Sequence, residues 1–460
     1  MRRTIPRRVV LWASLACAAL AAVGDAVSQE DRPGVPASEA SRRLGRRLFL
    51  RAWAPGDPRA GRGDGLGPVF NARSCVACHG LAGPGGGGTN DLNVELLAAI
   101  PLGAAPLAGE VKPAAPDRSL LTAIHPGFAE SGSIVLHRFG TSPDYPAWRA
   151  DAKMGQLTAA ALLGAGAPPP SSRRGAYKLP KVTSDFRMLT SFRNSPALFG
   201  SGRIDAIPEA AIEAEAKRQA GEVAAGRVSR LKDGRVGRFG WKAQVPGLEE
   251  FVLTACANEM GLEVPGHHQA PDPLGHDDGY TAEADMSGDD CVALVGFVRS
   301  LAAPGEWKGG DWRSRGRAVF EQTGCADCHR PNLGGVDGLY SDLLVHDMGP
   351  GLNDSAVYYG REEESSPGTP KSPEWRTPPL WGVADSAPYL HDGRAPNLAA
   401  AIKLHGGQAK SSADRFHALR PDERAELLGF LNSLRVRKAA KQTERDRLLA
   451  YEESVPTGSR

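Results

Sequence analysis

Two copies of the pattern Cys-x-x-Cys-His, at residues 75–79 and 325–329, constrain this chain more than any other feature. Two thiols three positions apart can add to the two vinyl groups along one edge of a haem, and the following histidine then reaches the iron as its proximal ligand. Zinc sites use Cys-x-x-Cys pairs that converge on one ion, and thioredoxin-like pairs need a βαβ context that this sequence lacks. The pattern therefore predicts two covalently bound haems c. The residues that would hold them are Cys75, Cys78, His79, Cys325, Cys328 and His329.

The sequence around the first motif is repeated around the second. Residues 41–53 (SRRLGRRLFLRAW) and 312–324 (WRSRGRAVFEQTG) precede the two motifs, and both contain Gly-x-x-aliphatic-Phe. Each motif is followed by a similar apolar segment, LVGFVRSL at 294–301 and LLGFLNSL at 427–434, with aliphatic residues on one helical face. The repeat predicts a duplicated unit in which an opening helix crosses a closing helix closely at its glycine.

The repeats divide the chain into two predicted haem domains. We expect a mainly α fold with two cytochrome c-like domains, at residues 40–302 and 311–436, followed by a charged tail at 437–460. The first domain is enlarged by insertions rich in Gly, Ala and Pro, which we interpret as loops. A further echo, RNSP at 193–196 and RTPP at 376–379, supports the duplication.

Residues 1–28 are typical of a signal peptide. Four arginines precede an apolar stretch from Val9 to Val23, and small residues follow at the expected cleavage region. The stretch is too short to span a bilayer comfortably and no later stretch is long enough, so we expect an exported, periplasmic protein with no membrane span. Lipid anchoring at Cys17 is disfavoured because Ser14 replaces the leucine usual three positions earlier.

The composition of the mature chain excludes one class of partner and leaves two cysteines unexplained. Removing residues 1–28 takes four arginines and Asp25 from 55 basic and 53 acidic residues. The near balance argues against a nucleic-acid partner.

Cys256 and Cys291 lie outside both haem motifs. An even remainder in an oxidising compartment favours a disulfide, whereas two buried thiols in apolar helices are the plainer interpretation.

Five further strings connect the chain to a known family. They are FRNSPALFG at 192–200, GRFGWKA at 237–243, SDLLVHDMG at 341–349, EWRTPPLWG at 374–382 and LHDGRA at 390–395. Together they resemble the di-haem oxidoreductase and peroxidase family, also labelled thiol oxidoreductase, within the bacterial di-haem cytochrome c peroxidase superfamily. The resemblance implies an enzyme that receives electrons from a small redox protein at the C-terminal haem and reduces peroxide or a related oxidant at the N-terminal haem. A non-catalytic electron carrier, or an oxidase of a thiol or protein side chain, are the alternatives.

The resemblance also suggests the sixth ligands of the two irons. Relatives place a Met or Tyr one helix after the HDG turn as distal ligand of the C-terminal haem, and here His405 takes that place, with Met348 as a competitor. Typical peroxidases have a displaceable histidine about sixteen residues after the first motif, but residues 81–97 contain neither His nor Met. The N-terminal haem is therefore open on one side or ligated from afar. The distant candidates are His125, His137, Met154 and Met188.

Four more residues receive roles from the resemblance. Glu209 is the candidate for the distal carboxylate of the superfamily, and Trp241 for the tryptophan that relays electrons between the haems. An acid at a helix start and a core-packing residue are the plainer interpretations of these two. Arg193 and Arg376 could pair with haem propionates. Relatives also hold Ca²⁺ between their domains, but no acidic cage for it is readable in this chain.

Overall fold

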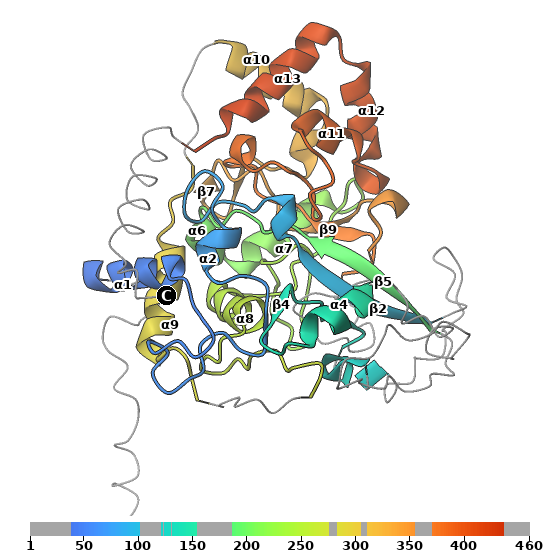
Figure 1. Cartoon of the computed structure of the whole chain (residues 1–460). Helices are drawn as coiled ribbons and strands as arrows, with labels where there is room; N and C mark the ends of the chain where they lie inside the picture. Colours follow the sequence, from blue (N-terminus) through green and yellow to red (C-terminus); the bar gives the residue numbers. More distant parts are fainter. Residues whose placement is uncertain are drawn as a thin grey trace, which may run out of the picture.

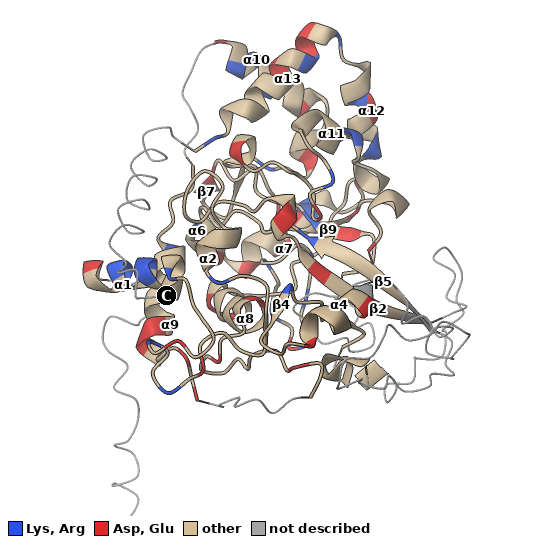
Figure 2. Cartoon of the chain, in the orientation of Figure 1, with Lys and Arg blue, Asp and Glu red and all other residues tan. Residues whose placement is uncertain are grey.

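The computed structural model describes residues 38–101, 121–122, 124–129, 131–153, 186–275, 283–304, 311–354 and 370–436. The predicted signal peptide, the predicted tail at 437–460 and Met154 lie outside these ranges. Within them, no helix is long and apolar enough to cross a membrane. Lys and Arg are interspersed with Asp and Glu along the described chain, in line with the near-balanced charge (Figure 2).

Helices dominate the described residues, as the sequence predicts (Figure 1). The helices before the second motif are α1 (Glu39–Leu50), α2 (Cys75–Cys78), α4 (Tyr145–Lys153), α6 (Ser201–Asp205), α7 (Glu209–Gln219), α8 (Leu248–Met260), α9 (Gly288–Arg299) and α10 (Asp311–Gln322). The helices that follow it are α11 (Leu398–Lys403), α12 (Lys410–Ala418) and α13 (Pro421–Ser433). The second motif itself begins as a 3₁₀ turn, η4 (Cys325–Asp327).

The strands are short and form small antiparallel sheets. They are β1 (Val69–Phe70), β2 (Val94–Pro101), β3 (Ser133–Val135), β4 (Phe139–Gly140), β5 (Phe186–Arg193), β6 (Asn332–Leu333), β7 (Val336–Asp337), β8 (Val345–Asp347) and β9 (Glu374–Arg376). The sheet orders are β1-β4, β3-β2-β5, β6-β7 and β8-β9. Arg193 ends β5 opposite Val94, and Arg376 ends β9 opposite Val345. The two arginines of the repeated Arg-x-x-Pro thus occupy equivalent strand ends.

The two predicted helix crossings are confirmed. α1 packs on α9, and α10 packs on α13. A Cβ on Gly45 would lie 1.9 Å from the Ala293 carbonyl oxygen, and one on Gly316 would lie 2.2 Å from that of Glu426, so only glycine allows these approaches. One pair of phenylalanine rings packs together at each crossing, with ring centroids 5.3 Å apart in both halves. The pairs are Phe49 with Phe297 and Phe320 with Phe430.

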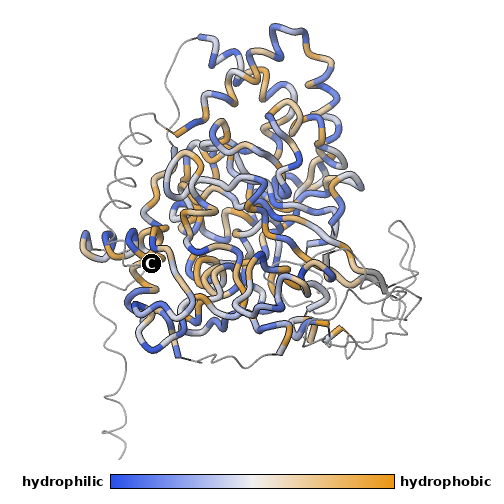
Figure 3. The backbone as a smooth tube through the Cα atoms, viewed as in Figure 1, coloured by the Kyte–Doolittle hydropathy of each residue, from blue (hydrophilic) through white to orange (hydrophobic). Residues whose placement is uncertain are grey.

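Separate apolar cores accompany the two crossings. The largest contains residues of α1, α8 and α9, and a second contains residues of α10, α11 and α13. Apolar and polar residues alternate along α10 to α13, as expected of helices that bury one face (Figure 3). A third core lies against the β3-β2-β5 sheet and α4, inside the segment that the sequence predicts to be loop-rich. That segment therefore carries packed structure of its own.

Candidate functional site

A cavity of about 280 Å³ is lined by both cysteines and the histidine of the second motif. Residues from the first half of the chain, among them Leu198 and Phe239, line it too. The histidines that face it are His329, His346, His391 and His405. No Asp or Glu of the described chain lines this cavity. Its chemistry is therefore that of imidazoles and one buried guanidinium in apolar surroundings.

His329 follows the η4 turn and is oriented by the backbone. Its Nδ1 donates to the Tyr340 carbonyl oxygen at 3.0 Å. Burial, with a smaller contribution from the nearby His405, lowers the pKa of His329 to about 4. A neutral imidazole with Nδ1–H bound to a carbonyl presents Nε2 as a lone pair, which is the arrangement that metal-binding histidines use.

His405 has the same orientation at the end of α11. Its Nδ1 donates to the Ala401 carbonyl oxygen, four residues earlier in the chain, at 2.8 Å. Burial lowers the pKa of this imidazole as well. The structure therefore brings His405 and His329 to one cavity as neutral rings, each with Nε2 left for a metal. Met348, the competing candidate, also lines the cavity.

Arg376 supplies a further sign that the cavity suits a haem. It is buried, lines the cavity and donates from Nε to the Gly240 carbonyl oxygen at 2.9 Å. Burial lowers its pKa to about 10, and no carboxylate of the described residues forms an ion pair with it. A buried cation beside a cavity fits an anionic group such as a propionate. Arg193 differs, because it pairs at 2.6 Å with Asp354, whose side chain is 9% exposed.

The first motif lies on α2, and its histidine is also held by backbone. Nδ1 of His79 lies 3.0 Å from the Pro196 carbonyl oxygen and 3.3 Å from that of Gly86. Burial lowers the pKa of His79 to about 4. The neighbouring Cys75 sulfur lies 3.7 Å from the sulfur of Met260. The first motif thus repeats the proximal geometry of the second.

The three described candidates for a distant ligand of the first motif have the following surroundings. His125 packs against Trp148 with ring centroids 5.9 Å apart, and its Nδ1 accepts from the Gly127 amide. His137 is held by the Asn258 carbonyl oxygen at 2.7 Å. Met188 belongs to the core beside the β3-β2-β5 sheet. None of the three lines the cavity described above.

Trp241 and Glu209 have different surroundings. Trp241 lines the cavity and donates from Nε1 to the Asn194 carbonyl oxygen at 2.9 Å. Glu209 begins α7, its side chain is 46% exposed, and it accepts from the Val236 amide. It does not line the cavity. The placement is that of an acid at a helix start, and the predicted acid–base role of Glu209 finds no support in it.

The disulfide favoured by the sequence is not formed in the structure. Cys256 on α8 and Cys291 on α9 are separate buried thiols. Burial raises the pKa of Cys291 to about 11 and that of Cys256 well above its usual value. Both side chains belong to the core around α1 and α9, so packing explains them.

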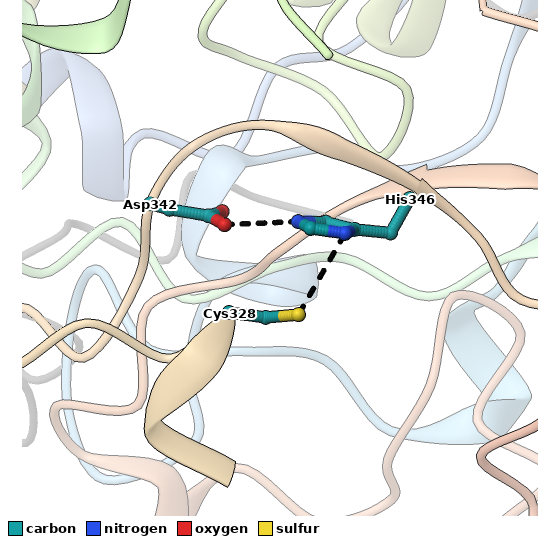
Figure 4. A group of neighbouring side chains, drawn as sticks. All are labelled: Cys328, Asp342 and His346. Atoms are coloured by element: carbon teal, nitrogen blue, oxygen red, sulfur yellow. Dashed lines mark hydrogen bonds and ion pairs between the residues drawn. The ribbon is translucent and has the colours of Figure 1, made fainter. Parts of the chain in front are cut away.

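Sequence reasoning missed two groups beside the cavity. His346 lies between the Asp342 carboxylate and the Cys328 sulfur (Figure 4). Among the described His, Cys, Asp and Glu side chains, these three form the group whose ligand atoms lie close enough together to hold a metal ion. The His391 ring stacks on Trp375, with centroids 3.7 Å apart. Asp342 and His346 belong to the string SDLLVHDMG, Trp375 to EWRTPPLWG and His391 to LHDGRA, but no spacing rule predicts which of these side chains meet.

Comparisons with known proteins found relatives and solved structures that match parts of the chain. Hydrazine synthase subunit gamma of Kuenenia stuttgartiensis is 28% identical over 174 residues, 31% of this chain and 48% of that relative, so the match spans about half of the relative's length. A solved MauG-like protein associated with microbial copper homeostasis is 20% identical, with a TM-score of 0.29 over 51% of this chain and 91% of that one. Hydrazine synthase of Kuenenia stuttgartiensis, pressurised with 20 bar xenon, has 18% identity and a TM-score of 0.27 over 53% and 73%.

The family comparison covers more of the chain. Both TM-scores are too low for the solved structures to support a conclusion about the fold of this chain. A family model described as "Di-haem oxidoreductase, putative peroxidase" matches residues 172–434, more than half of the chain. The matched range contains the second motif, His405 and all five strings noted above. The chain therefore belongs to the di-haem oxidoreductase family of enzymes.

Proposed function

We propose that this protein is an exported c-type cytochrome that reduces peroxide or a related oxidant at an N-terminal haem with electrons received through a C-terminal haem. The observation that carries the proposal is the pair His329 and His405, which face one cavity with each Nδ1 tied to a backbone carbonyl. For His79 the proposal follows the sequence, because residues 81–97 contain no His or Met that could occupy the other side of an iron held there. An iron with both axial positions filled favours electron transfer, and an iron with one open position permits chemistry. The C-terminal site would therefore take up electrons, and the N-terminal site would react with the oxidant.

The cofactor assignment follows the two motifs. Residues 40–302 form the first haem domain and residues 311–436 the second, each built on one of the two helix crossings. Thioether bonds to both cysteines of each motif attach the haems. When bound, the haems supply one-electron storage and an iron at which hydrogen peroxide takes up two electrons and two protons and becomes two water molecules. The iron ligands are His79 in the first domain and His329 with His405 in the second.

The chain's own residues then have distinct tasks. His405 fixes the coordination of the C-terminal site, which limits reorganisation when an electron arrives. Trp241 lies along the cavity between the two halves, with its indole held by Asn194, and serves as the relay. Arg376 balances a propionate. An external carrier, such as a small redox protein, delivers the electrons in the periplasm.

Selective removal of each motif tests the proposal. Cys75→Ala with Cys78→Ala should leave one covalent haem per chain, and Cys325→Ala with Cys328→Ala should leave the other. Haem staining of denaturing gels and the pyridine haemochrome ratio count them. Cys291→Ala, which removes a buried thiol outside both motifs, is the matched control and should retain two haems.

Peroxide consumption with a reduced artificial donor then separates the rival functions. Both haem-deficient proteins should lose turnover, since one lacks the open site and the other lacks electron entry. A wild-type protein with two haems and no peroxide turnover would favour the electron carrier. A wild-type ratio near one haem per chain would refute the two-haem assignment itself.

A further inference from the structure

A buried histidine outside the iron ligands contacts the cysteine that would carry the C-terminal haem. His346 lies on β8 and is only 3% exposed. Its Nε2 lies 2.9 Å from Oδ2 of Asp342, and its Nδ1 lies 3.6 Å from Sγ of Cys328 (Figure 4). The imidazole therefore bridges a buried carboxylate and the haem-attachment sulfur.

Asp342 is held firmly in the accepting role. It is fully buried, and its Oδ2 also accepts from Nε2 of Gln219 at 2.9 Å. Its Oδ1 accepts from the Leu344 amide at 3.0 Å. A carboxylate with these donors accepts a third hydrogen bond from the imidazole, so Nε2 of His346 carries a hydrogen.

The protonation of Nδ1 is then decided by the sulfur. A thiol can donate to a bare Nδ1, but attachment of a haem moves the thiol hydrogen to the vinyl carbon and leaves a thioether. A thioether sulfur only accepts hydrogen bonds. A neutral ring with hydrogen on Nε2 would set two lone pairs against each other, whereas an imidazolium would donate from Nδ1. Haem attachment thus favours the charged ring.

The surroundings favour the same charge. Burial opposes it, but the hydrogen bond and the charge of Asp342 prevail and raise the pKa of His346 to about 10. The nearby Cys328 sulfur adds to this rise, and the contribution of Asp342 remains after the thiol has reacted. Backbone packs tightly on the ring, because a Cβ on Gly226 would lie 2.5 Å from Cε1 of His346. The imidazole therefore has little room to rotate away.

We propose that His346 is a positioning residue of the C-terminal haem, donating from Nδ1 to the thioether sulfur of Cys328 and holding a positive charge at that edge of the haem. The inference rests on the haem assignment of the proposed function. A positive charge beside a haem stabilises the ferrous state relative to the ferric state, so it raises the reduction potential. This suits a haem that accepts electrons from an outside donor.

The same three side chains would offer a metal site only in a chain without haem. Their ligand atoms lie within 4.8 Å of one another. Thioether formation uses the Cys328 thiol, and a thioether is a far weaker ligand than a thiolate. In the haem-loaded protein the arrangement therefore acts on the haem.

Redox titration of the haem-loaded protein tests the proposal. In His346→Gln, the potential of the C-terminal haem should shift downward, because glutamine keeps a polar side chain without the charge. The N-terminal haem of the same molecule should keep its potential. His268→Gln removes an exposed histidine and should change neither haem. His346→Lys, which restores a cation, should recover part of the shift.

An unchanged C-terminal potential in His346→Gln with both haems attached would overturn the inference. If that protein fails to assemble, His346→Asn is the second test, because it also removes the charged ring and leaves Asp342 in place. Its C-terminal potential should fall, and a wild-type potential in that protein would equally overturn the inference. The haem count of the wild-type protein is measured first, so a failure of the two-haem assignment is recognised separately.

Discussion

The two halves of the chain hold their motif histidines alike but differ in what faces them. In the first half Nδ1 of His79 is fixed by the Pro196 carbonyl, and in the second Nδ1 of His329 is fixed by the Tyr340 carbonyl, both at 3.0 Å. His405 faces the cavity of His329, whereas His125 is locked in a separate core. The backbone contact of the motif histidine and the helix crossing thus recur in both halves, whereas a second histidine facing the motif histidine is described only for the second half.

The divergence extends to the repeated arginines and to the cysteine environment. Arg193 is neutralised within the protein by Asp354, while Arg376 faces the cavity without a carboxylate partner in the described chain. Cys328 contacts His346, an arrangement that the described neighbours of Cys78 do not repeat. The second half therefore places a buried cation, Arg376, at its cavity, which suits the electron-entry role proposed for that site.

Replacing His405 should have the largest effect on the properties that distinguish the C-terminal haem site from the N-terminal one. His405→Ala should turn the C-terminal haem high-spin or water-ligated, since the imidazole proposed as its sixth ligand is lost, and should reduce electron delivery by at least about tenfold. His405→Met should restore six-coordination at a higher potential, because a thioether favours ferrous iron relative to imidazole. Optical spectra, redox titration and donor-dependent turnover measure these changes. Met348→Leu is the control, and a low-spin signal that persists in His405→Ala but disappears in Met348→Leu would move the ligand to Met348.

The two arginines should respond differently to the same substitution. Arg193→Met removes the cation that pairs with Asp354, whose side chain is only 9% exposed, and should lower the free energy of unfolding by about 3–5 kcal/mol. Arg376→Met should instead shift the potential of the C-terminal haem downward, because it removes a cation beside the cavity. Denaturant titration and redox titration of the haem-loaded proteins compare them. If both variants lost the same stability and neither changed a haem potential, the two arginines would have the same structural role, and this prediction would be wrong.

His125 gives the smallest and most specific test. Burial lowers its pKa to about 3, below the roughly 6.5 of an unfolded histidine. The unfolded chain therefore binds a proton first, and the neutral side chain's contribution to stability is lost as the pH falls from about 6.5 toward 3. Between pH 7 and pH 5, the free energy of unfolding of His125→Phe should fall by about 2 kcal/mol less than that of the wild-type protein. Urea unfolding measures the difference, and a changed spectrum of the N-terminal haem in this variant would identify His125 as a ligand.

Features set by local spacing or by the repeat were predictable from the sequence. The crossings at Gly45 and Gly316 follow from a small residue in an amphipathic helix, and the structure confirms both. The position of His405 beside the cavity follows from its place after the HDG turn.

Contacts between distant segments were not predictable in this way. The sheet that pairs β2 with β5 joins residues about ninety positions apart, on either side of a segment with no periodic pattern. The Asp342–His346–Cys328 contact depends on how β8 packs against η4, which no local rule encodes. For Cys256 and Cys291, residue type and count allowed either a disulfide or two buried thiols, and the structure has two buried thiols.

Electron paramagnetic resonance of the oxidised protein tests the central contrast most directly. The account predicts one low-spin ferric signal from the site of His329 and His405, and one high-spin ferric signal from the site of His79. The low-spin signal should remain when Cys75 and Cys78 are replaced by alanine, and the high-spin signal should remain when Cys325 and Cys328 are replaced. Two low-spin signals in the wild-type protein would contradict the open N-terminal site and indicate an electron carrier.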